Sequence, residues 1–177
     1  MNISRSILFL ALASITPGVQ AGEPEDAIPE PTVFVQQAAQ TGLTEIEAAK
    51  IALARSQDPG IRSFAQRMVK DHGKSNIELA ALATEKGIDA PTTLDAEHQA
   101  MLDDITSKTG ADFDRSYAEH MHMGHIKAVA LFEAAANSPD MAVSGFAKKN
   151  LPALREHKQL AEKLPGASVK GSPAGGR

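Results

Sequence analysis

Apolar residues recur with a helical period in five separate stretches of the chain. The clearest stretch runs from Pro59 to Lys86, where six residues fall on one stripe at about 100° per residue. They are Ile61, Ala65, Met68, His72, Leu79 and Ala83. A histidine therefore occupies the middle of an apolar face, with the acid Asp71 beside it. This pattern predicts a helix of about seven turns that other helices cover.

Three further long segments and one short segment are also predicted to be helices. They are 32–56, 96–107, 111–136 and 141–164. Turn sequences at 58–60 and 137–140 join the long segments into two tight hairpins. The short helix lies in the long connection between the hairpins. This connectivity predicts an all-α fold, a ferritin-like four-helix bundle made of two helical hairpins with a long crossover carrying a short helix.

Two local features refine these helices. Thr32 is the expected N-cap of the first long helix, because its side-chain oxygen can accept a hydrogen bond from a backbone N–H group. Pro152 is expected to kink or split the last helix near Leu151, because proline lacks a backbone donor. Gly42 interrupts the first helix, but it also allows a close approach by a neighbour.

The first 21 residues have the pattern of a secretory signal peptide. Arg5 precedes the apolar run from Ile7 to Ile15, and cleavage is expected after Ala21. The run is too short to remain as a membrane anchor, so we expect no membrane-spanning segment after cleavage. The sequence thus predicts a periplasmic protein.

Composition divides the remainder and excludes several functions. Residues 22–31 are acidic and proline-rich and predict a linker, 32–164 form the bundle, and 165–177 predict a disordered tail. Without Arg5, 17 basic residues face 22 acidic ones, a formal charge of -5 that gives no support for nucleic-acid binding. The absence of cysteine excludes disulfides, thiolate metal sites and a cysteine nucleophile.

Four residues from the four long helices are predicted to face one interior. They are Glu45, His72, His125 and His157. Imidazole and carboxylate suit one transition metal ion such as iron, zinc or copper, and bundle cores are where such sites are built. Asp71, Tyr117 and Glu156 are the expected supporting residues.

The positions of the turns bear on whether the four residues can meet. Glu45 lies 13 residues before Asp58 and His72 lies 14 residues after it, so a tight hairpin places them at nearly the same height. His157 lies further from its turn than His125 does, which leaves open whether the four share one layer or two. The alternative to a metal site is a polar network in which Glu45 accepts hydrogen bonds from His72 or His157.

A di-iron centre of the ferritin type is not expected. That centre uses a glutamate three residues before each of two ligand histidines. Val69 and Leu154 occupy these positions here, and the acids Asp71 and Glu156 are predicted to point about 100° away from the histidines that follow them. No separate general base accompanies the candidate ligands, so we assign no catalytic residue, and a metal-dependent enzyme is the least favoured alternative.

A second candidate is the run from His120 to His125, which alternates imidazoles with thioethers and suits copper(I) or silver. The candidate soft-metal cluster consists of His120, Met121 and His122. On a helix this run spreads around most of the circumference, so only Met121 or His122 can act together with His125. The plainer interpretation places Met121 in the core and His122 and Met123 at the surface.

Several segments between Val33 and Leu164 carry a resemblance to one bacterial family. These segments are Phe34–Ala39, Gly42–Glu45, Phe64–His72, Phe113–Tyr117 and Leu151–His157. The chain resembles the secreted domain-of-unknown-function 4142 family, whose members are often labelled membrane or outer-membrane proteins. The resemblance implies a ferritin-like helical domain with an exported address and no established activity.

These observations lead to one expected function and one alternative. The expected function is that of an exported binding or accessory protein, linked to envelope stress, whose core holds a transition metal. The alternative is a purely structural or interaction module whose interior histidines form a satisfied network without metal. No nucleic-acid partner is expected, the protein partner is unknown, and a homo-oligomer is left open.

Overall fold

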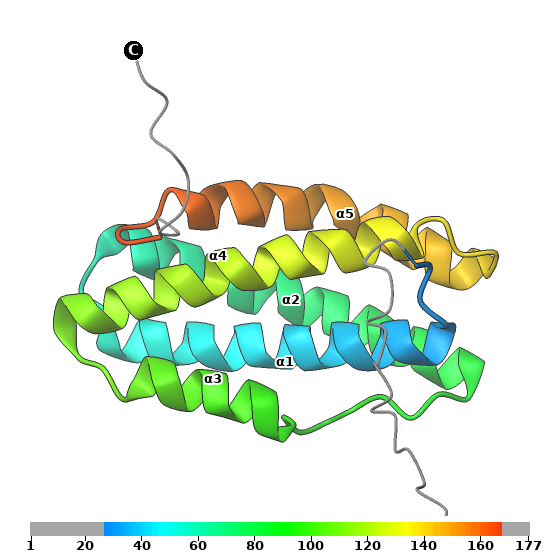
Figure 1. Cartoon of the computed structure of the whole chain (residues 1–177), viewed down its shortest axis with the longest axis horizontal. Coiled ribbons are helices and arrows are strands. Elements are labelled where there is room, and N and C mark those ends of the chain that lie inside the picture. Colours follow the sequence, from blue (N-terminus) through cyan, green and yellow to red (C-terminus); the bar gives the residue numbers. More distant parts are fainter. Residues whose placement is uncertain (1–26, 168–177) are drawn as a thin grey trace, which may run out of the picture.

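The computed structural model describes residues 27–167, which form five helices and no strand. The helices are α1 (Pro31–Arg55), α2 (Pro59–Lys86), α3 (Ala96–Thr106), α4 (Gly110–Ala135) and α5 (Met141–Glu162) (Figure 1). The predicted all-α class is confirmed. The predicted signal peptide lies outside the described residues, as do 22–26 of the linker and 168–177 of the tail.

The long helices pack in the order that the turns predict. α1 packs most extensively on α2, and α4 on α5, while further contacts join α1 to α4 and α2 to α5. The short helix α3 lies along α1, as Figure 1 shows, and it also contacts α4. None of the helices within residues 27–167 is long and apolar enough to cross a membrane.

Helix ends follow capping chemistry with one departure from expectation. The Asp58 carboxylate accepts a hydrogen bond from the Ile61 N–H at 2.9 Å and begins α2. Thr32 is not the cap of α1, because the helix begins at Pro31, whose ring fixes a helical φ at the first turn.

Pro152, in the middle of α5, does not split this helix, which continues to Glu162. Leu151 and Leu154, which precede and follow Pro152, are both buried in the first core.

Two apolar cores fill opposite halves of the molecule. Major members of the first core are Phe34, Val35, Leu79, Phe132, Phe146 and Leu154. Major members of the second core are Ile61, Phe64, Met68, Phe113, Tyr117 and Met121. Along each long helix, one of the four candidate polar residues lies between the segments that feed the two cores: Glu45, His72, His125 and His157. The fold therefore carries a polar layer between its two cores.

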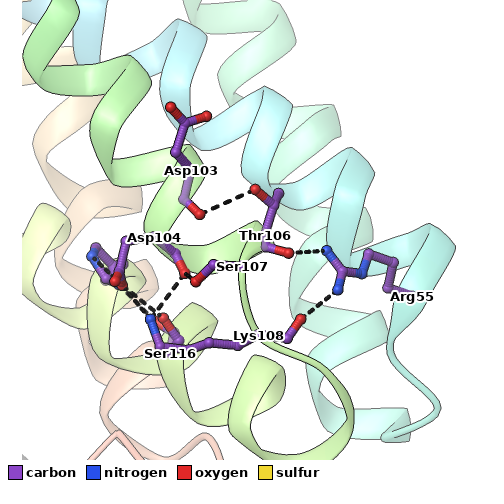
Figure 2. A network of polar contacts seen from close by, with 8 residues as sticks. Arg55, Asp103, Asp104, Thr106, Ser107, Lys108 and Ser116 are labelled. Carbon is purple, nitrogen blue, oxygen red and sulfur yellow. Dashed lines mark hydrogen bonds and ion pairs between the residues drawn. The ribbon is translucent and has the colours of Figure 1, made fainter.

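Helix α3 is fixed to α1 at both of its ends. Gln40 donates to the Thr93 carbonyl at 3.1 Å and accepts from the Asp95 N–H at 3.2 Å. At the other end, the Arg55 guanidinium donates to the carbonyls of Thr106, at 2.9 Å, and Lys108 (Figure 2). These contacts hold α3 over α1 although the connection around it is long.

A polar network also joins the end of α3 to α4. The Ser116 hydroxyl donates to Asp104 Oδ2 at 3.2 Å, and the Ser107 hydroxyl donates to the Asp104 carbonyl at 2.7 Å (Figure 2). The position of α3 relative to both α1 and α4 is therefore set by specific hydrogen bonds.

The predicted tail begins with two exposed residues, Pro165 and Gly166, but Ala167 is packed. Ala167 is buried in the second core, and its N–H donates to the Leu164 carbonyl at 3.1 Å. Gly166 adopts a φ of 86°, and a Cβ there would lie 3.0 Å from the Arg115 Cα. Glycine is required because this left-handed conformation brings the backbone against α4.

Candidate metal centre

Three imidazoles from three helices converge in the polar layer. One ligand atom from each of His72 on α2, His125 on α4 and His157 on α5 lies within 4.8 Å of the other two. The ring centroids are 5.3 to 5.6 Å apart. All three residues are buried, with exposed fractions of 6% or less.

Glu45 on α1 contacts two of these imidazoles. Its Oε2 lies 3.1 Å from His72 Nε2, and its Oε1 lies 3.3 Å from His125 Nδ1. Neither contact has hydrogen-bond geometry, so both carboxylate oxygens are buried without a hydrogen-bond partner. The equal height predicted for Glu45 and His72 from the turn at Asp58 is confirmed. Glu45 is not a member of the group in which all ligand atoms converge.

A backbone carbonyl orients His125. Its Nδ1 lies 2.8 Å from the Met121 carbonyl oxygen, which can only accept a hydrogen bond. The Nδ1 atom therefore carries the proton, and the lone pair of the neutral ring is on Nε2. This Nε2 is buried and has no hydrogen-bond partner. An imidazole held in this way is ready to bind a metal through its free nitrogen.

A carboxylate orients His157 in the same manner. His157 Nε2 donates to Asp71 Oδ2 at 3.0 Å, which leaves the buried Nδ1 without a partner. Asp71 is held in turn by Arg67, and Arg67 forms an ion pair with Glu156 at 2.8 Å. Asp71, predicted to point away from His72, contacts His157 instead, because α5 packs on α2.

Burial keeps two of the imidazoles neutral. Burial lowers the pKa of His72, although the neighbouring Glu45 carboxylate opposes this effect. Burial also lowers the pKa of His157, to about 4, against the opposing hydrogen bond with Asp71. A neutral imidazole is the form that binds a metal ion, so both rings are in the binding form at neutral pH.

The dimensions of the cluster suit a single metal ion after a small contraction. Ligand atoms bound to one tetrahedral ion at about 2.1 Å lie about 3.4 Å apart. The three histidine atoms lie within 4.8 Å, so side-chain rotations would have to bring them closer. A cavity of about 40 Å³ touches Glu45, Asp71, His72 and His157. It is large enough for a water molecule, which needs about 10–15 Å³.

Tyr117 does not join this cluster. Its hydroxyl is buried without a hydrogen-bond partner, and its ring packs against Phe64 and Phe113 in the second core. Burial, and after it the charge of Glu45, raises the pKa of Tyr117. Tyr117, an expected supporting residue, therefore makes no hydrogen bond to Glu45 or to the three histidines.

The run from His120 to His125 is divided between different environments. Met121 is fully buried in the second core and Met123 is 40% exposed, both as the plainer interpretation predicted. His122 is 8% exposed, so its predicted surface position is wrong. His120 lies near Asp104 on the side facing α3, with 3.7 Å between His120 Nε2 and Asp104 Oδ2. The three residues of the predicted soft-metal cluster therefore differ in burial and in contacts.

The sequence reasoning missed the role of Arg67. This residue contacts both Asp71 and Glu156 and so links the acids that precede the two histidines. The contact of Arg67 with Asp71 could have been predicted from the sequence, because residues four positions apart are neighbours on a helix. The contact with α5 could not be derived without the helix packing.

Residues 17–164 match the family described as Domain of unknown function (DUF4142). The chain belongs to the DUF4142 family. This confirms the family that the sequence motifs indicated. A comparison with curated protein sequences found no match.

Two solved structures share the fold of this DUF4142 chain. A DUF305 fragment from Deinococcus radiodurans is 20% identical, with a TM-score of 0.67 over 77% of this chain and 95% of the fragment. The structure of CopM in the Cu(II)-bound form is 16% identical, with a TM-score of 0.62 over 75% of this chain and 93% of CopM. At these identities the likeness establishes the fold alone.

Proposed function

We propose that this protein binds one transition metal ion in its core through His72, His125 and His157. The observation that carries this proposal is the convergence of three buried imidazoles, each of which has a buried ring nitrogen without a hydrogen-bond partner. His125 Nε2 and His157 Nδ1 are both buried without a partner. Each unpaired buried polar atom costs about 1–3 kcal/mol, so a bound ion would relieve a cost that the fold otherwise carries.

In this proposal the carboxylates of Asp71 and Glu45 contact the histidine ligands, and neither carboxylate binds the ion itself. Asp71 holds His157, and Glu45 lies beside the ring nitrogens of His72 and His125. Their negative charges would offset the charge of a divalent ion in a buried site. Three histidines leave a fourth position open, and the cavity of about 40 Å³ beside His72 and His157 can supply a water molecule there.

Copper(II) is the ion that we propose first, with zinc second. Imidazole ligands suit both, and affinity for a given nitrogen site is highest for copper among the divalent first-row metals. The CopM structure in its Cu(II)-bound form, which shares the fold, supports the same choice. Because the cluster lacks the glutamates of a di-iron centre, ferroxidase chemistry gains no support.

We further propose that the four long helices form a ferritin-like bundle and that the protein is exported and serves metal handling under envelope stress. Support for the bundle comes from the pairing of α1 with α2 and of α4 with α5 across one long connection. Support for export comes from the basic, apolar and small residues of positions 1–21.

The rival function is a structural or interaction module with a metal-free polar network. The contacts of Glu45 with His72 and His125 favour it, because a carboxylate beside two imidazoles can fix the register of three helices. The unpartnered atoms of the same three residues speak against a satisfied network.

Metal analysis of the protein purified from the periplasm separates the two functions. We expect one copper or zinc ion per chain in the wild type, lost in the His72→Gln, His157→Gln double variant. The matched control is Val143→Ala, which removes buried apolar volume from α5 in the first core and should keep the ion. The proposal fails if the wild type contains no metal and also binds no Cu(II), Zn(II) or Fe(II) on titration.

A further inference from the structure

A second hollow, distinct from the cavity beside the histidine cluster, also borders Glu45. It has a volume of about 250 Å³ and lies between α1, α3 and α4. Three of the six methionines of the chain line it, together with two histidines. These residues are His98 and Met101 from α3 and His120, Met121 and Met123 from α4. No other described hollow gathers thioethers in this way.

We infer that this hollow is a second metal site, which binds a soft monovalent ion of the Cu(I) class through Met101, Met123, His98 and His120. Thioether sulfur combined with imidazole nitrogen is the ligand set that such ions prefer. Hard ions such as Mg²⁺ and Ca²⁺ require oxygen ligands and are not suited to it. The inference goes beyond the function proposed above and does not depend on the core histidines.

Both imidazoles are already oriented for this role. His120 Nδ1 donates to the Ser116 carbonyl at 2.8 Å, and His98 Nδ1 lies 2.8 Å from the Asp95 carboxylate. In the neutral tautomer that these contacts favour, the proton is on Nδ1 and the lone pair is on Nε2, and His120 Nε2 also lies 3.7 Å from Asp104 Oδ2. Orientation of a histidine through its second nitrogen is the usual arrangement behind a metal ligand.

The hollow is accessible to solvent, as a site that captures ions must be. Met123 is 40% exposed, and the side chains of His98 and His120 are 26% and 28% exposed. Met121 is fully buried and forms the inner wall. The acids Glu45 and Glu97 and the single base Lys127 also line the hollow, so a cation meets more negative than positive groups there.

The hollow is held open by the anchoring of α3. Gln40 fixes the chain before α3, and Arg55 fixes the chain at its C-terminal end (Figure 2). The distance between the ligands on α3 and those on α4 is therefore set by the fold. A preorganised site of this kind loses less entropy when the ion binds.

Glycine at position 124 places the hollow next to the core. A Cβ at Gly124 would lie 3.5 Å from Glu45 Oε1, and Glu45 lines both this hollow and the cavity beside the core histidines. Thr41 and Glu45 line both hollows, so the two sites are neighbours within the fold.

The test uses silver(I) as a redox-inert substitute for Cu(I), with methionine methyl groups labelled with ¹³C for NMR. The protein is the His72→Gln, His157→Gln variant, so that the core site does not contribute. We expect the Met101 and Met123 methyl signals to shift and to saturate at one equivalent of silver. Met141, which is 83% exposed, and Met68, which is fully buried in the second core, are the internal controls and should not shift.

A second variant confirms the assignment of the ligands. Adding Met101→Leu and Met123→Leu keeps the apolar volume and should weaken silver binding by more than about 100-fold, since losing a group that only orients a ligand costs about 10- to 100-fold. The inference is overturned if Met141 shifts together with Met101 and Met123, which would show non-specific thioether binding, or if no methyl group shifts. Copper(II) binding by the wild-type core is measured separately, so failure of one site is distinguished from failure of the other.

Discussion

Asp71 Oδ2 on α2 accepts a hydrogen bond from His157 Nε2 on α5 at 3.0 Å, between residues 86 positions apart in the chain. Burial acts to raise the pKa of Asp71, but the hydrogen bond from His157 and the charge of Arg67 outweigh it and lower that pKa. Asp71 therefore remains a carboxylate and holds the His157 ring with Nδ1 free. The packing of α5 on α2 therefore determines which ring nitrogen of His157 carries the proton and which one is free.

Replacing Asp71 with asparagine should weaken metal binding without unfolding the protein. The amide can still accept the His157 proton, but it lacks the charge that strengthens the hydrogen bond and offsets the ion. We expect copper(II) affinity to fall by about 10- to 100-fold in a competition titration. The control is Glu47→Gln, whose side chain is 47% exposed and contacts Lys50, so it should leave the affinity unchanged. Equal affinities for Asp71→Asn and the wild type would contradict the assigned role of Asp71.

Replacing Glu45 with glutamine distinguishes the metal site from a metal-free network. Glu45 is 2% exposed and its oxygens lack hydrogen bonds, so the amide, which can donate to a ring nitrogen, should raise the melting temperature of the metal-free protein. The gain in melting temperature on adding copper(II) should become smaller. Glu47→Gln, on the exposed side of α1, should change neither value. If Glu45 instead belongs to a metal-free polar network, Glu45→Gln should lower the melting temperature of the metal-free protein.

The metal-free protein should lose stability as the pH falls from about 6.5 to 4. The pKa of His157 drops from the ordinary value of 6.5 to about 4 on folding, so the unfolded chain binds the extra proton between these values. Stability is therefore complete above pH 6.5 and is lost toward pH 4, by up to about 3 kcal/mol from this residue. Urea unfolding at pH 7.5, 5.5 and 4.5 measures the effect. His157→Gln should flatten the pH dependence, and an unchanged dependence would contradict the prediction.

Two glycine substitutions test the packing after α5. Gly166→Ala should destabilise the protein by about 1–3 kcal/mol, because the residue has a φ of 86° and its Cβ would meet Arg115. Gly73→Ala is the matched control, since a Cβ at this helical position meets nothing within 4 Å. It should stabilise the protein by up to about 1 kcal/mol. Thermal unfolding of both variants gives the comparison, and a neutral Gly166→Ala would show that residues 165–167 are not held against α4.

The helices could be predicted because periodicity and capping are local. The helix Pro59–Lys86 was predicted with both ends correct, since Asp58 supplies a cap and Gly87 adopts the left-handed conformation that ends it. The burial of all six stripe residues from Ile61 to Ala83 is also confirmed. The approach of a neighbour to Gly42 is confirmed as well, because a Cβ there would lie 2.2 Å from Asn76 Oδ1.

The candidate site could be predicted only in part, because its contacts depend on how each helix is rotated about its axis. The short turn at Asp58 fixes the relative height of Glu45 and His72, and this relationship was accessible from the sequence. The contact of Asp71 with His157 requires the packing angle of α2 on α5, which no spacing specifies. Burial of His122 was missed for the same reason, since its side of α4 is covered only once the neighbouring helices are in place.

The polar layer has a consequence for a chain that contains no cysteine. An ion bound by His72, His125 and His157 would cross-link α2, α4 and α5, closing two chain loops as a pair of disulfides would. Such closure lowers the entropy of the denatured ensemble, and longer loops gain more. A chelator would then act on this protein as a reducing agent acts on a disulfide-bonded one.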